Sequence, residues 1–182
     1  WGLFDEQLQM LQHIARWKDR LQLIFCMGNN EKFQCQLLED EMFRHPNIRI
    51  IGFTREIDKW MEVSDLLITK PGGLTCTEAM TKGIPMLFYR PLPGQEEENC
   101  QYFVELGYGK QITSLQTIDQ AFAELMERYP EWRKRRAEAG QRASTYHPYQ
   151  CAETILSLLS ETSGLNWNVG QKHAETVFIN GN

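Results

Sequence analysis

The sequence predicts an α/β domain in which helices cover both faces of a parallel sheet, a doubly wound architecture. Three observations support this fold class. Short apolar runs alternate with longer amphipathic segments along most of the chain. Glycine or proline separates these segments at most junctions. At 182 residues, the chain is also long enough to bury the core of one domain.

The expected elements follow from apolar spacing and from the residues that interrupt it. Residues 3–16 have apolar side chains at helical spacing, with Asp5 and Glu6 near the start, where acids favour a helix. Gly83 stands just past the end of the helix near the middle of the chain. The expected helices are 3–16, 31–43, 57–61, 74–83, 95–106, 118–128, 131–143 and 150–159, and the expected strands are 21–26, 47–51, 66–69, 86–89 and 108–112.

The stretch from Asp65 to Glu78 is the strongest local signal. A buried strand ends at Pro71, and Gly72 and Gly73 let the backbone turn and be approached closely from outside. The helix that follows has no acid before Glu78. Its free backbone N–H groups and its positive end can therefore face an anion, most often a phosphate. For two glycines alone, an ordinary strand-to-helix turn is the favoured alternative.

Glu78 adds chemistry to this turn. It lies one turn into the helix, and its side chain leans back toward the N-terminus. A carboxylate there can accept hydrogen bonds from both hydroxyls of a ribose while backbone amides bind a diphosphate. A solvated helix acid is the alternative. Ligands of such sheets bind at the carboxyl ends of strands, which singles out three loops: residues 53–55, 71–75 and 91–99.

Composition narrows the function classes. A formal net charge of −5 argues against nucleic acid as the main partner, although it leaves a membrane surface open. The five cysteines are widely spaced, which is typical of reduced thiols in a cytoplasmic protein. The histidines are equally scattered, so no metal site is expected. No apolar run is long enough to span a membrane.

A series of short motifs occurs between residues 21 and 159: Gly52-Phe-Thr54, Ile68-Thr-Lys-Pro-Gly-Gly-Leu-Thr75, Glu78-Ala79, Lys82-Gly-Ile-Pro85 and Pro93-Gly-Gln-Glu-Glu-Glu-Asn99. Together they resemble the C-terminal, donor-binding half of a GT-B glycosyltransferase. The similarity is to bacterial diacylglycerol glucosyltransferases and plant monogalactosyldiacylglycerol synthases, with the lipid II GlcNAc transferase as a more distant relative. The resemblance implies a Rossmann-like sheet of about six strands in the order 3-2-1-4-5-6.

The resemblance also implies a set of substrate-binding residues in or beside the three loops. It places Phe53 and Thr54 at the uracil ring, and Gly72, Gly73, Leu74 and Thr75 at the diphosphate. It places Glu78 at the ribose hydroxyls and Gln95 and Glu96 at the donor sugar, with Asn99 supporting the loop or the sugar. Structural alternatives remain: Phe53 as a core residue, Glu96 in a solvated acidic helix start, and Asn99 as an ordinary helix residue.

The function implied by the resemblance is transfer of a hexose from a UDP-sugar to a lipid acceptor such as diacylglycerol. The leaving diphosphate gains charge, which must be stabilised where it develops. The chain has no convincing acidic metal motif, so we expect helix N-terminal amides to do this without a metal or another cofactor. The catalytic base is expected on an absent N-terminal domain that binds the acceptor, and this half alone is expected to be inactive.

Two other function classes fit the same residues. The chain could be a non-catalytic subunit or sensor that binds a nucleotide-sugar and docks onto a separate acceptor-binding protein. A nucleotide-sugar epimerase of the same architecture is a weaker alternative. An acceptor domain encoded on the same chain would favour the transferase over the subunit.

A basic run, Arg133-Lys-Arg-Arg136, lies within an expected helix. It could contact anionic headgroups, which would make the protein cytoplasmic and peripheral to the inner face of a membrane. A solvated helix face is the favoured interpretation, because only a few of these side chains can share one side of a helix.

The C-terminal segment predicts an unusual chain order. Relatives begin this domain with an apolar strand and a glycine-rich loop, whereas here Trp1-Gly2 directly precede the first expected helix. Residues 176–179 are a β-prone run that ends before a glycine turn. We expect residues 1–160 to form a nucleotide-sugar-binding domain, with residues 161–182 supplying a connection and a central strand at 176–179, as in a circular permutant. A truncated fragment with an unstructured tail is the alternative.

Overall fold

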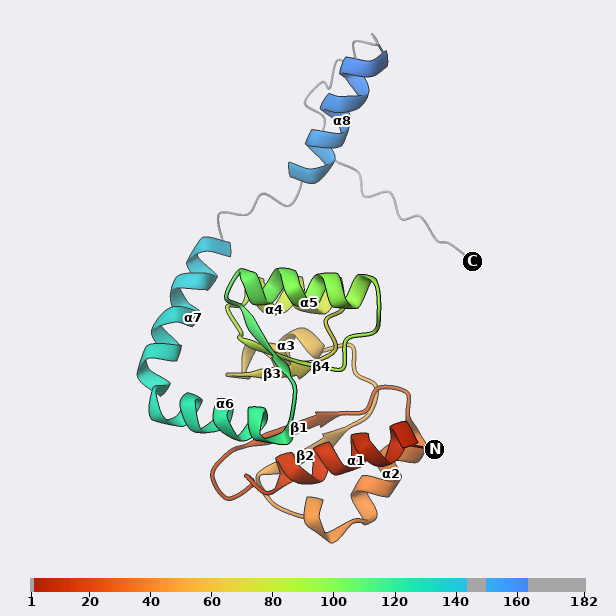
Figure 1. Ribbon diagram of the computed structural model, residues 1–182, viewed down its shortest axis with the longest axis vertical. Helices are drawn as coiled ribbons and strands as arrows, with labels where there is room; N and C mark the ends of the chain where they lie inside the picture. The colour runs from red at the N-terminus through yellow and green to blue at the C-terminus, as the bar shows by residue number, and fades with distance from the viewer. Residues whose placement is uncertain (1, 144–149, 164–182) are drawn as a thin grey trace. The chain divides into compact units, whose positions relative to one another are not determined.

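The computed structural model describes residues 2–143 and 150–163, which fall into two units. Helix α8 (Gln150–Ser163) belongs to the second unit and is described by itself. The first unit alternates helices and strands, as expected (Figure 1). Its elements are α1 (Gly2–Ala15), β1 (Leu23–Cys26), α2 (Glu31–Glu39), the 3-10 helix η1 (Glu41–Phe43), β2 (Ile48–Ile51), α3 (Ile57–Glu62), β3 (Leu67–Thr69), α4 (Gly73–Thr81), β4 (Met86–Tyr89), α5 (Gln95–Glu105), β5 (Gly109–Ile112), α6 (Leu115–Glu127) and α7 (Tyr129–Ala143).

Every strand pairing in the described part is parallel. β1 pairs with β2, with Leu23 opposite Ile48. β3, β4 and β5 pair in that order, with Thr69 opposite Phe88. The described residues therefore hold two sheets of two and three strands, and the continuous order 3-2-1-4-5-6 is not confirmed. In a sheet of that order, the central strand would lie between β1 and β3. The strand expected at residues 176–179 lies outside the described residues, so the circular permutation stays a prediction.

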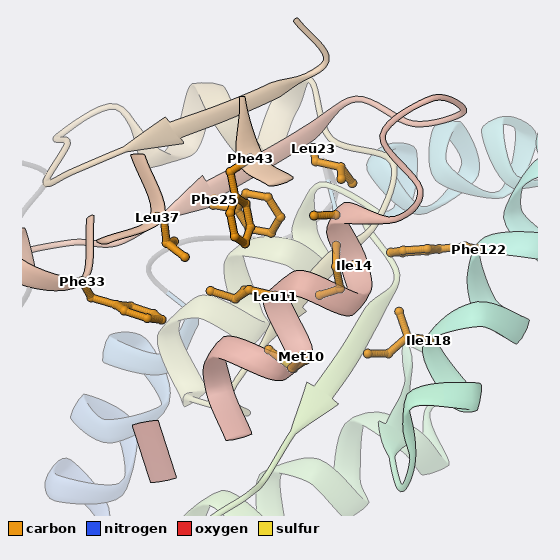
Figure 2. Close-up of a cluster of buried hydrophobic side chains, with 11 residues drawn as sticks. Met10, Leu11, Ile14, Leu23, Phe25, Phe33, Leu37, Phe43, Ile118 and Phe122 are labelled. Atoms are coloured by element: carbon orange, nitrogen blue, oxygen red, sulfur yellow. The ribbon is translucent and has the colours of Figure 1, made fainter. Parts of the chain in front are cut away.

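Helices pack on both faces of the three-stranded sheet, which supports the α/β class with parallel strands. Successive strand residues point to opposite faces: Ile68 of β3 contacts one core cluster and Leu67 contacts the other. Figure 2 shows the first cluster, where α1, α2 and α6 meet β1. Its buried residues are Met10, Leu11, Ile14, Ala15, Leu23, Phe25, Phe33, Leu37, Phe43, Ile118 and Phe122.

The second core cluster lies where α3, α4 and α5 pack on the three-stranded sheet. Its buried residues are Met61, Cys76, Ala79, Ile84, Met86, Phe88, Cys100 and Phe103. Gly109 of β5 is in close contact with β4, because a Cβ on Gly109 would lie 2.6 Å from Cε2 of Phe88 and 2.9 Å from the carbonyl oxygen of Met86. This cluster supports the loops that precede α4 and α5.

A polar network links α1 to α6 beside the first cluster. The Oδ1 atom of Asp119 lies 2.9 Å from Nε2 of His13 and accepts a hydrogen bond of 2.7 Å from the indole N–H of Trp17.

The basic run on α7 is partly neutralised by contacts of its last residue, Arg136. Arg136 pairs with Asp65 at 3.4 Å and donates to the carbonyl oxygen of Glu62. Arg136 therefore stabilises the domain through contacts within it. A membrane contact of this helix stays a prediction.

Several boundaries differ from the expected ones; α8, for example, ends at Ser163 rather than at residue 159. The expected helix at 31–43 is divided, because Asp40 has an extended backbone (ψ 121°) and its side chain accepts a hydrogen bond of 2.9 Å from the N–H of Met42. Helix α6 begins at Leu115, earlier than expected, directly after Ser114. Among the described residues, no helix has both the length and the apolar character that crossing a membrane would need.

Candidate functional site

The turn before α4 leaves its backbone accessible. Gly72 has φ −73° and ψ 133°, an extended conformation that any residue adopts, and a Cβ on it would meet nothing within 4 Å. The fold therefore does not require a glycine at this position. Helix α4 starts with neither a side-chain cap nor an acid in its first turn, which leaves its first N–H groups available to an anion.

Asn99 of α5 is joined to this turn. Its side-chain N–H group donates a hydrogen bond of 3.0 Å to the carbonyl oxygen of Pro71, and its Nδ2 atom lies 3.8 Å from the place of a Cβ on Gly73. Helices α4 and α5 lie side by side (Figure 1). The structure thus brings together the turn at residues 71–75 and the loop at residues 91–99, and Asn99 is more than an ordinary helix residue.

We expect Asn99→Ala to lower the free energy of unfolding by about 1 kcal/mol, because the carbonyl oxygen of Pro71 loses its partner. Urea unfolding followed by circular dichroism measures this loss. Gln101→Ala is the matched control, since the Gln101 amide donates to the exposed Glu105 on the same helix, at 2.8 Å. Equal stability of the two variants would contradict a role for Asn99 in holding the turn.

The loop before α5 has a defined geometry of its own. Gly94 has φ +95° and ψ −128°, a conformation reserved for glycine, and it precedes the first residue of the helix, Gln95. The carboxylate of Glu96 accepts a hydrogen bond of 2.8 Å from the N–H of Leu92. Glu96 thus holds its own loop, whereas the side chain of Gln95 is exposed. Their roles toward a sugar stay predictions.

The loop after β2 belongs to the two-stranded sheet. The side chain of Phe53 is 65% exposed, so the alternative that it is a core residue is wrong. Thr54 accepts a hydrogen bond of 3.0 Å from the N–H of Glu56. Gly52 is in close contact with α2, since a Cβ there would lie 2.8 Å from Oε1 of Gln34. This packing leaves the Phe53 ring open to a ligand.

Each of the three loops presents one large apolar side chain to solvent. Leu74 is 85% exposed and Leu92 is 55% exposed, and both accompany the exposed Phe53. Exposed apolar groups at the carboxyl ends of parallel strands are suited to contact a bound molecule or a second domain. The sequence pattern identified Leu74 through its motif, whereas the exposure of Leu92 has no sequence signal beyond its place between two prolines.

Glu78 lies in the second turn of α4 with an exposed side chain. Its carboxylate has no ion pair among the described residues: the nearby Lys82 pairs with Glu62, at 3.6 Å. The carboxylate of Glu78 therefore does not stabilise the described part of the domain through an ion pair. A carboxylate one turn beyond an acid-free helix start remains available to hydroxyl groups of a ligand.

A family model for the "Glycosyltransferase family 28 C-terminal domain" matches residues 5–153. The chain belongs to this family. The match covers the three loops, the acid-free start of α4 and both core clusters.

Relatives of this family 28 domain include two named enzymes. The chain is 33% identical over 155 residues to the "Processive diacylglycerol beta-glucosyltransferase" of Staphylococcus saprophyticus, covering 85% of the chain and 39% of the relative. It is 30% identical over 154 residues to the protein of the same name from Staphylococcus carnosus, again covering 85% and 39%. The chain thus spans well under half the length of these relatives.

Solved structures share the fold of the family 28 domain. MurG of Acinetobacter baumannii matches with a TM-score of 0.50 at 20% identity, covering 79% of this chain and 53% of that one. A glycosyltransferase of kitacinnamycin matches with a TM-score of 0.52 at 14% identity, covering 75% and 43%. These likenesses support a GT-B glycosyltransferase fold for the domain.

Buried thiols lie beneath the candidate site of the family 28 domain. Burial, together with the neighbouring Cys100, raises the pKa of the Cys76 thiol to about 11. Burial also raises the pKa of Cys100. Both thiols stay protonated at neutral pH, which makes them packing residues rather than nucleophiles. Within the described part, no three His, Cys, Asp or Glu side chains are grouped to hold a metal ion, and metal-free binding stays a prediction.

Sequence reasoning missed Arg90. It follows β4 directly and has φ +44°, a left-handed conformation. A signal for it exists in the sequence, since Arg90 is the one charged residue between a buried strand and the Pro-Leu-Pro-Gly loop.

Proposed function

We propose that this family 28 domain is the nucleotide-sugar-binding half of a glycosyltransferase that moves a hexose from a UDP-sugar to a lipid acceptor such as diacylglycerol. The observation that carries the proposal is the uncapped, acid-free start of α4 behind an accessible Gly72. The names of the staphylococcal relatives supply the reaction class, with glucose as the sugar and diacylglycerol as the acceptor.

The proposed chemistry uses the backbone rather than a metal or another cofactor. The diphosphate would lie against residues 72–75, where N–H groups and the positive end of α4 stabilise the charge that develops as the sugar leaves. Glu78 would accept hydrogen bonds from the ribose hydroxyls, and Phe53 and Thr54 would hold the uracil ring. Gln95 and Glu96 would contact the sugar, while Asn99 keeps the turn and the loop together.

None of the residues named in this proposal binds the acceptor. The base that removes the acceptor proton is expected on another domain, and we expect the chain alone to bind the donor without transferring the sugar. A lipid acceptor implies a place at the cytoplasmic face of a membrane, and no nucleic acid partner is expected at a net charge of −5.

Isothermal titration with UDP, uridine and UDP-glucose, each with and without EDTA, tests the donor site. We expect UDP to bind at least about tenfold more tightly than uridine, because the diphosphate contributes charge-assisted hydrogen bonds. EDTA is expected to leave the UDP affinity unchanged. Equal and negligible affinity for UDP and uridine would overturn the proposed diphosphate site, and loss of UDP binding in EDTA would overturn its independence from metal.

A further inference from the structure

Arg90 has a backbone conformation that its position in the sequence disfavours. Its φ of +44° is the one positive φ outside glycine among the described residues. A side chain with a Cβ disfavours this left-handed region, and a residue before a proline is driven toward extended φ values. Pro91 follows Arg90 directly. Such a conformation persists only where the surrounding contacts hold it, and it is typical of ligand-binding loops.

Two contacts hold the Arg90 side chain. Its Nη2 atom forms an ion pair with Oε2 of Glu6, near the start of α1. Its guanidinium carbon lies 5.6 Å from the centre of the Tyr89 ring, a cation–π distance. The Tyr89 ring in turn packs against the first core cluster. Arg90 thereby joins the end of β4 to the start of α1 at the surface, with its side chain 43% exposed and that of Glu6 48% exposed.

Arg90 lies just past the end of β4, level with Pro71 past the end of β3, and it directly precedes the loop before α5. Thr69 of β3 is opposite Phe88 of β4, so Pro71 and Arg90 each lie two residues beyond this last pair. Pro71 leads into the turn before α4, and Arg90 leads into residues 91–94 and Gln95. The direction of the chain at Arg90 therefore determines where Gln95 and the loop point, whereas the turn before α4 is held separately through Asn99.

We propose that Arg90 is a positioning residue for the sugar side of the donor site. Its ion pair with Glu6 fixes the strained backbone and thereby aims Gln95 and the loop of residues 91–94 at the hexose of a nucleotide-sugar. This inference rests on the proposed function, because it requires the sugar to bind at the start of α5. It predicts that the ion pair acts on recognition of the sugar and leaves recognition of the diphosphate unaffected.

Titration of the full chain with UDP and with UDP-glucose separates these two effects. Arg90→Asn removes the cation and places a residue that tolerates left-handed φ. Glu6→Gln removes the partner and leaves Arg90 in place. We expect either variant to weaken UDP-glucose binding about five- to tenfold, as expected for a displaced substrate-contacting loop, and UDP binding by less than about twofold. The charge-swapped pair Glu6→Arg with Arg90→Glu is expected to bind UDP-glucose more tightly than Arg90→Glu alone.

The outcomes distinguish this inference from the proposed function. A wild-type chain that binds neither ligand overturns both. A wild-type chain that binds both ligands, with UDP-glucose affinity unchanged in Arg90→Asn and Glu6→Gln, overturns the role of Arg90 alone. An equal loss of affinity for UDP and UDP-glucose also overturns it, because that pattern indicates general damage to the domain rather than displacement of Gln95 and its loop. If Arg90→Asn fails to fold, Glu6→Gln decides the matter, since it alters only an exposed side chain of α1.

Discussion

Replacing Glu78 with alanine is expected to weaken UDP binding by about 1.5–3 kcal/mol, the size of a hydrogen bond to a charged group, which is about 10- to 150-fold in affinity. The fold is expected to persist, because the exposed carboxylate has no ion pair among the described residues. Calorimetric titration gives the affinity, and a thermal melt gives the stability of the same sample.

The design separates a ligand contact from a general effect of charge. Glu127→Ala removes another exposed acid from a helix, far along the chain on α6, and is expected to leave UDP binding as in the wild type. Because UDP and UDP-glucose share the ribose, Glu78→Ala should weaken both equally, unlike Arg90→Asn. Wild-type affinity of Glu78→Ala, or its failure to fold, would show that the carboxylate has another role.

Gly109→Ala is expected to lower the free energy of unfolding by about 1–3 kcal/mol through overpacking. The added methyl group would lie 2.6 Å from Cε2 of Phe88 and 2.9 Å from the carbonyl oxygen of Met86, and the second of these atoms belongs to the backbone. Phe88 cannot move away easily, because it is fully buried and tilted against Phe103 with ring centres 6.4 Å apart. Urea unfolding measures the effect.

Gly72→Ala is the matched control for stability, since its methyl group would meet nothing within 4 Å and its φ is −73°. A second variant identifies the colliding group. Adding Phe88→Leu to Gly109→Ala removes the ring and is expected to cost less than the sum of the two single changes. Wild-type stability of Gly109→Ala would mean that β4 and β5 separate more readily than this close contact implies.

Local pattern was sufficient for most elements of the first unit. The apolar runs and the glycines placed α4, β4 and α5 within a residue or two of their observed bounds. The sequence also predicted that the start of α4 carries no acid before Glu78, since that depends only on the order of residues. Asp40 shows the limit, because its preference for an extended, capping conformation divided one expected helix into α2 and η1.

The features that depend on distant residues could not be predicted locally. The order of strands depends on which edges meet, and the described residues show two sheets rather than one. The link from Asn99 to Pro71 joins residues 28 positions apart. Arg90 is harder still, because a residue before proline is normally extended, and the side chain of Arg90 pairs with Glu6, which lies 84 positions earlier in the chain.

Both sheets are built from strands that are consecutive in the chain. Each can therefore form from neighbouring βα units. Units of this kind often open and close cooperatively, independently of the rest of a domain. The turn before α4 and the loop before α5 both belong to the three-stranded sheet, whereas residues 53–54 follow the two-stranded one. A donor bound in the proposed way would contact loops of both sheets, and it would therefore slow amide exchange in β1 and β2 as well as in β3, β4 and β5.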